Sequence, residues 1–134
     1  MRRAEDLLED AEDFLGAAKD LLVTGRWAKV CFMAQQAAEL AAKAALNALG
    51  RERRGYSVHR LLEELSGLLP GGEDVAALVE DAKILDQYYI PTRYTNAFPE
   101  GSAKSHFTER QAKEAVEIAE RILGRMEGVV RGRE

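Results

Sequence analysis

Residues 88–101 are the stretch of the sequence whose residue types most clearly suggest chemistry. The stretch contains two prolines, three of the four tyrosines of the chain and one arginine, Arg93. Aromatic rings beside a guanidinium offer stacking faces and hydrogen-bond donors for anions, as in nucleotide or nucleic-acid contacts. We therefore expect a nucleotide- or RNA-binding surface here. Its candidate residues are Tyr88, Tyr89, Arg93, Tyr94 and Asn96.

The same segment also fits a structural role. Residues 88–107 hold five of the nine aromatic residues of the chain. A compact loop with that many rings can close the open end of a helical bundle. Long loops in small helical domains are nevertheless uncommon and often carry function. The sequence leaves both interpretations open.

A second charged group lies at residues 51–60, where four arginines and a histidine accompany a single acid. The chain as a whole has a formal net charge of −4, which argues against a general DNA-binding protein. A basic patch of this kind could bind phosphate or an acidic partner, although a solvated turn is the more common explanation of such surface charge. Its members are Arg51, Arg53, Arg54, His59 and Arg60.

Other kinds of site find little support. The two histidines, His59 and His106, are far apart in the sequence and no helix carries a Glu-x-x-His pair, so we predict no metal site and no cofactor. Cys31 is the single cysteine and lies on an apolar helix face, which predicts inert burial. An arginine and a histidine could act together on a phosphodiester. Two such pairs exist, Arg54 with His59 and Arg93 with His106.

Five helical segments follow from the periodicity of the apolar residues, and no segment alternates as a strand would. Glycines follow the first two helices, Ser57 is a plausible N-cap of the third, and Pro91 ends the fourth. Thr108 and Gln111 have the spacing of a capping box for the fifth. Asp86 could receive Arg93, receive a tyrosine hydroxyl or face water. The segments span about residues 3–23, 26–49, 58–69, 73–90 and 109–127.

These segments predict an all-α fold: an up-and-down four-helix-type bundle with five helical segments and one long loop before the last helix. At 134 residues the chain forms one domain, which we expect at residues 1–127, followed by a frayed tail at 128–134. No apolar run approaches the roughly 20 residues of a membrane-spanning helix. The first residues lack the apolar core of a signal peptide, so we expect a cytoplasmic protein with no membrane association.

Three separated segments resemble the HEPN domain family. Residues 32–44 resemble its second-helix signature, residues 59–65 its third helix, and residues 89–97 its tyrosine- and arginine-bearing loop. The resemblance covers about residues 5–125. It implies a helical bundle that is often dimeric and is commonly encoded beside a minimal nucleotidyltransferase, in many cases as a toxin–antitoxin pair. The alanine-rich second helix and the apolar residues 27–33 also favour a homodimer, because five short helices leave some of this surface uncovered.

Catalytic members of this family cleave RNA with an arginine that is followed a few residues later by a histidine. Arg93 matches that arginine by position, but Phe98, Pro99 and Glu100 stand where the histidine would be. Our main hypothesis is therefore a non-catalytic subunit that binds nucleotide or RNA or pairs with a nucleotidyltransferase. The alternatives are a metal-independent ribonuclease that uses Arg93 with His106, and a purely structural assembly module.

Overall fold

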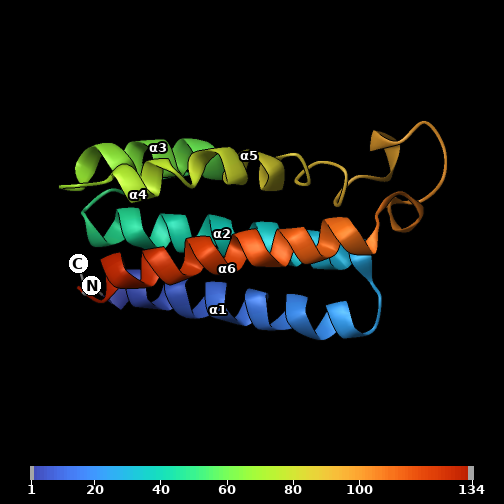
Figure 1. The fold of residues 1–134 in the computed structure, drawn as a ribbon, viewed down its shortest axis with the longest axis horizontal. Helices are drawn as coiled ribbons and strands as arrows, with labels where there is room; N and C mark the ends of the chain where they lie inside the picture. Colours follow the sequence, from blue (N-terminus) through green and yellow to red (C-terminus); the bar gives the residue numbers. More distant parts are fainter. Residues whose placement is uncertain (1, 133–134) are drawn as a thin grey trace.

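The computed structural model describes residues 2–132, whose regular elements are all helices and which contain no strand (Figure 1). Three long helices pack against one another, and three shorter ones cover one side of this group. This arrangement confirms the predicted all-α bundle. The long helices are α1 (Arg2–Val23), α2 (Trp27–Ala48) and α6 (Glu109–Val130); the shorter ones are α3 (Val58–Leu68), α4 (Glu73–Ala76) and α5 (Val79–Asp86).

Helix α2 is the centre of the bundle and contacts α1, α3, α5 and α6. Its buried positions are dominated by alanine, whose small side chain lets neighbouring backbones approach closely. Most of the larger side chains of the core come from the surrounding helices and include Leu8, Leu62, Leu85 and Ile122, each fully buried. The fully buried alanines of α2 are Ala34, Ala37, Ala38, Ala41, Ala42, Ala44 and Ala45.

The connection from α2 to α3 runs back along α2. The amide of Gln35, in the first half of α2, donates to the carbonyl oxygen of Tyr56 at 3.2 Å. Asn47, near the end of α2, lines the same hollow as Arg53. Residues 51–57 therefore return from the end of α2 towards its middle, and α3 begins there. This return places the basic patch beside the segment that carries Arg93.

The predicted fourth helix, residues 73–90, is not continuous. It is divided into α4 and α5, because the amide of Leu78 bonds to the carbonyl of Val75, three residues back, and so tightens the turn between them. Helix α5 ends at Asp86, before Pro91. Tight turns continue to Arg93, and the hydroxyl of Thr92 donates to the carbonyl of Tyr88 at 2.6 Å. The segment before α6 also contains two 3₁₀ turns, η1 (Thr95–Ala97) and η2 (Ala103–His106).

The capping box that begins α6 is confirmed. The hydroxyl of Thr108 accepts the backbone N–H of Gln111 at 3.1 Å, and the Gln111 side chain accepts the N–H of Thr108 at 2.9 Å. At its other end α6 continues to Val130, beyond the point where we expected a frayed tail. Val129 holds this last turn in place, because its side chain is only 8% exposed and belongs to the core.

The predicted inert burial of Cys31 is confirmed, since the residue is fully buried in the core. Burial away from water disfavours the thiolate and raises the pKa of the thiol to about 12. Among residues 2–132, no helix is both long enough and apolar enough to cross a bilayer.

Candidate functional site

Arg93 belongs to a stack of aromatic side chains. Its guanidinium carbon lies 4.3 Å from the ring centroid of Phe32, on α2, and 3.8 Å from that of Tyr89. The ring of Tyr89 is also stacked on Tyr56, with centroids 3.6 Å apart and planes inclined by 13°. Because Tyr56 covers one face of Tyr89, the guanidinium occupies the other face. The order of layers is Phe32, Arg93, Tyr89, Tyr56, and we call these four residues the Arg93 stack.

Hydrogen bonds fix the guanidinium within the stack. Its Nη1 donates to the carbonyl of Tyr89 at 2.9 Å, and its Nη2 donates to Gln35 Oε1 at 3.0 Å and to Gln36 Oε1 at 2.6 Å. Gln35 is fully buried and its amide nitrogen donates in turn to Glu39 at 3.2 Å. The side-chain oxygens of both glutamines therefore accept from the arginine of the candidate site.

Two N–H donors of the guanidinium are not used within the described chain. An arginine has five N–H groups. The three bonds to Tyr89, Gln35 and Gln36 leave the Nε–H and one Nη1–H without a partner in the part of the chain that the structure describes. Partial burial lowers the pKa of Arg93, and the nearby carboxylate of Glu39 opposes this shift. An arginine remains charged under such conditions, so the half-buried group is a fixed cation with a free edge.

The other candidate residues within the segment 88–101 lie either in the core or on the surface. Tyr88 is 7% exposed and packs edge-on against Phe107 at 5.7 Å, and burial raises the pKa of its hydroxyl to about 12. Tyr88 is therefore a core residue with no free ring face. Tyr94 is 51% exposed, and Asn96 is exposed in the turn η1.

His106 lies in a separate cluster from Arg93. Its imidazole stacks on Phe98, with centroids 4.0 Å apart, and its Nε2 lies 2.7 Å from the carbonyl oxygen of Glu100. These partners belong to residues 98–106, whereas those of Arg93 are on α2 and at Tyr89. Within the described residues 2–132 of one chain, Arg93 and His106 have no shared partner.

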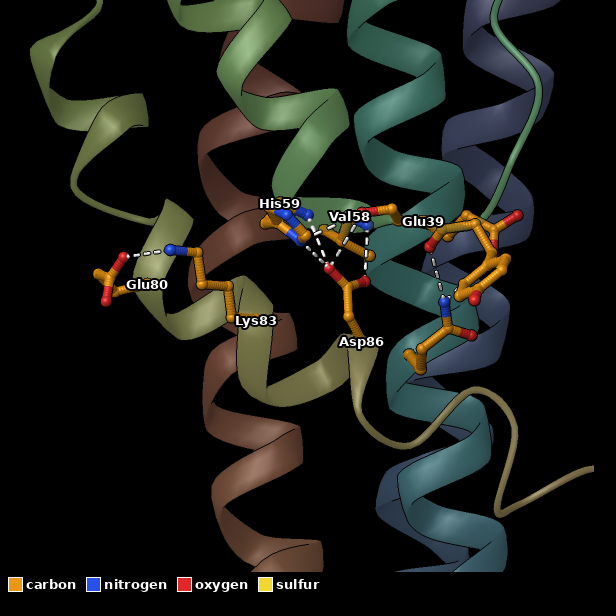
Figure 2. Close-up of polar contacts among 9 residues, drawn as sticks. Glu39, Val58, His59, Glu80, Lys83 and Asp86 are labelled. Carbon is orange, nitrogen blue, oxygen red and sulfur yellow. Dashed lines mark hydrogen bonds and ion pairs between the residues drawn. The ribbon is translucent and has the colours of Figure 1, made fainter. Parts of the chain in front are cut away.

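A polar cluster joins the start of α3 to the end of α5 (Figure 2). The carboxylate of Asp86 accepts the N–H groups of Val58 at 2.7 Å and of His59 at 3.1 Å, and the hydroxyl of Ser57 at 3.3 Å. Its Oδ2 also lies 2.5 Å from Nδ1 of His59. None of the three expectations for Asp86 is correct, because it caps α3 instead.

The expectation for Ser57 is half right. Ser57 occupies the N-cap position, but its side chain does not cap the helix. The capping acceptor comes from Asp86, 28 residues from Val58 along the chain. A carboxylate at this end of a helix satisfies free N–H groups and interacts favourably with the helix dipole.

An open hollow of about 580 Å³ lies beside this cluster, and we call it the basic hollow. It brings together four members of the predicted basic patch but not Arg51. Tyr56, the outer layer of the Arg93 stack, also lines it, so the hollow and the stack are neighbours. Its lining residues are Arg53, Arg54, Gly55, Tyr56, Ser57, His59, Arg60, Leu61, Glu64 and Asp86.

Within residues 2–132, no group of three histidine, cysteine or acidic side chains is placed to hold a metal ion. What the site offers is a fixed guanidinium, stacked aromatic rings and a neighbouring basic hollow. Charged donors and π faces in this arrangement suit an anionic ligand with aromatic parts.

Comparisons with known proteins agree with this architecture. The HEPN domain profile matches residues 4–129, while the chain matches none of the curated proteins with which it was compared. The solved structure of TT1696 from Thermus thermophilus is 45% identical, with a TM-score of 0.85, and the match covers 96% of this chain and 99% of that one. ST0689, an archaeal HEPN homologue, is 35% identical with a TM-score of 0.78, and the match covers 97% of this chain and 99% of that one. The HEPN domain protein TM0613 from Thermotoga maritima is 32% identical with a TM-score of 0.71, and the match covers 94% of this chain and 98% of that one. The chain belongs to the HEPN domain family.

Proposed function

We propose that this HEPN domain is a non-catalytic subunit that binds nucleotide or RNA through the face that carries Arg93. The observation that carries the proposal is the guanidinium held between Phe32 and Tyr89 with two N–H groups still free. A donor that is already fixed loses little conformational entropy when it binds a phosphate. The exposed ring of Tyr94 and the partly exposed ring of Tyr56 add stacking surface nearby.

The separate positions of Arg93 and His106 favour binding over cleavage. A ribonuclease of the arginine–histidine type needs both groups within reach of one phosphodiester. The two side chains contact different parts of the chain, and His106 already has Phe98 and Glu100 as partners. A structural role of Arg93 is a stronger alternative to binding than cleavage is, because its guanidinium is hydrogen-bonded within the chain. The following experiment distinguishes ligand binding from a structural role.

Replacing Arg93 by glutamine should weaken binding of a short single-stranded RNA or of ATP by about 10- to 100-fold, the usual worth of a charge-assisted hydrogen bond to phosphate. Isothermal titration calorimetry measures the change. Arg93→Lys should recover only part of the affinity, because lysine keeps the charge but loses the planar fork. Arg110→Gln is the matched control: Arg110 is an exposed arginine of α6 with no partner in the described chain.

Circular dichroism should show folded protein for all three variants. Equal binding heats for wild type and Arg93→Gln would refute the role of Arg93. Absence of binding in the wild type would refute the proposed function and leave the structural role.

We also propose that the domain is a homodimer and pairs with a minimal nucleotidyltransferase, as the family resemblance implies. The exposed apolar side chains of Ile90 and Tyr94, which are 45% and 51% exposed, supply surface for such contacts next to Arg93. Sedimentation velocity at micromolar concentration should show a dimer, and Ile90→Asp should shift it to monomer. A wild-type protein that sediments only as monomer would contradict the homodimer.

A further inference from the structure

We infer that the basic hollow binds a terminal phosphomonoester, the dianionic end of a mononucleotide or of a 5′-phosphorylated RNA. This inference rests on the proposed function and adds to it a site separate from Arg93. It follows from three features of the hollow: its unbalanced charge, the orientation of His59 and the ring of Tyr56.

The charges of the hollow leave two arginines without a carboxylate partner. Glu64 is bonded to Arg53, with its oxygens 2.6 and 2.7 Å from the guanidinium. Asp86 is engaged by the start of α3 and by His59. Arg54 and Arg60 are both exposed and have no partner in the described chain. Two free guanidinium groups match the two negative charges of a phosphomonoester better than the single charge of a phosphodiester.

The imidazole of His59 is oriented with one nitrogen free. Its Nδ1 faces Asp86 Oδ2 at 2.5 Å and the Ser57 hydroxyl at 3.1 Å. The ring lines the hollow and its side chain is 26% exposed, while Nε2 has no partner in the described chain. When the ring is protonated, its Nε2–H can donate to a phosphate oxygen and Asp86 balances the charge. Asp86 is a positioning residue here, because two backbone N–H groups hold its carboxylate in place.

Tyr56 makes an organic phosphate a better ligand than inorganic phosphate. One face of its ring is covered by Tyr89, but the residue is 39% exposed and lines the hollow. The uncovered face can stack on a base while the phosphate lies among Arg54, His59 and Arg60. Base–aromatic stacking contributes about 1–3 kcal/mol per base and tolerates any base. The site should therefore require the phosphate but should discriminate little between bases.

Calorimetry with two matched pairs of ligands tests the inference: AMP against adenosine, and a short RNA with a 5′-phosphate against the same RNA with a 5′-hydroxyl. We expect the phosphorylated member to bind at least tenfold more tightly in one or both pairs. The pair with the larger ratio identifies the source of the phosphate. The double variant Arg54→Gln/Arg60→Gln should abolish this preference, whereas Arg110→Gln should retain it.

The outcomes separate this inference from the proposed function. If the wild type binds RNA or AMP with no preference for the terminal phosphate, or if the double variant keeps the preference, the inference is overturned while the role of Arg93 stands. If the double variant loses the preference but Arg93→Gln keeps it, the phosphate site is supported and separate from Arg93. His59→Asn, checked for folding by circular dichroism, should reduce the preference as well.

Discussion

Replacing Asp86 by alanine should lower the free energy of unfolding by about 3 kcal/mol, as expected when a helix cap and the contact with the His59 imidazole are lost together. The carboxylate accepts the N–H groups of Val58 and His59, and the variant removes this acceptor at a partly buried position. It also removes the partner of the His59 imidazole and the polar link between α3 and α5. Urea denaturation followed by circular dichroism measures the change.

Asp81 provides a control on the same helix. Its carboxylate pairs with Arg121 across the surface, where both side chains are more than one-third exposed, so Asp81→Ala should cost less than about 1 kcal/mol. Ser57 can partly rescue Asp86→Ala, because its hydroxyl is free to turn and cap α3 once the carboxylate is gone. The double variant Asp86→Ala/Ser57→Ala should therefore lose more than the sum of the single losses. Equal losses for Asp86→Ala and Asp81→Ala would contradict the capping role.

The cap of α3 shows what the sequence could not predict. Helix starts are read from residues next to them, and Ser57 was therefore the natural candidate. The acceptor that the structure places there belongs to Asp86, and only the packing of α5 against α3 brings it close. The partners of Arg93 were hidden for the same reason: Gln35 lies 58 residues away. The one available signal was a pair of glutamines in an apolar helix.

The long helices were predictable because their signals are local. The predicted bounds 3–23 and 26–49 agree with the observed helices Arg2–Val23 and Trp27–Ala48 to within one residue at every end. Apolar spacing sets the body of each helix, and a glycine with positive φ follows each one: Gly25 at 78° and Gly50 at 80°. The division of residues 73–90 was missed, because its apolar spacing is continuous and the tight turn at Leu78 leaves no glycine or proline to mark it.

The candidate site was predicted in part. The types of residue at 88–94 indicated the guanidinium and the rings, and the charge at 51–60 indicated the basic patch. Sequence could not show that the two are neighbours, because this depends on residues 51–57 returning along α2 so that Tyr56 meets Tyr89. It also could not assign Tyr88 to the core and Tyr89 to the stack, since the tight turns after α5 decide which way adjacent side chains point.

The stability of the protein should fall steeply in alkaline solution, by about 3 kcal/mol between about pH 8 and pH 10.5. Burial raises the pKa of the Cys31 thiol from 9.0 to about 12 and that of the Tyr88 hydroxyl from 10.0 to about 12. Above pH 9 the unfolded chain loses these protons while the folded protein keeps them. The unfolded state then binds fewer protons, so the free energy of unfolding decreases over this range and continues to fall until the pH reaches the folded-state pKa values of about 12.

Two conservative variants identify the groups responsible. Cys31→Ala should remove about two-thirds of the alkaline loss, because the larger pKa shift belongs to the thiol. Tyr88→Phe should remove most of the remainder while its ring still packs against Phe107. Urea denaturation at several pH values gives the slope of the free energy of unfolding against pH for each variant. The small cavity in Cys31→Ala lowers the free energy of unfolding equally at every pH and therefore does not change this slope. A slope unchanged in both variants would show that neither buried group causes the loss.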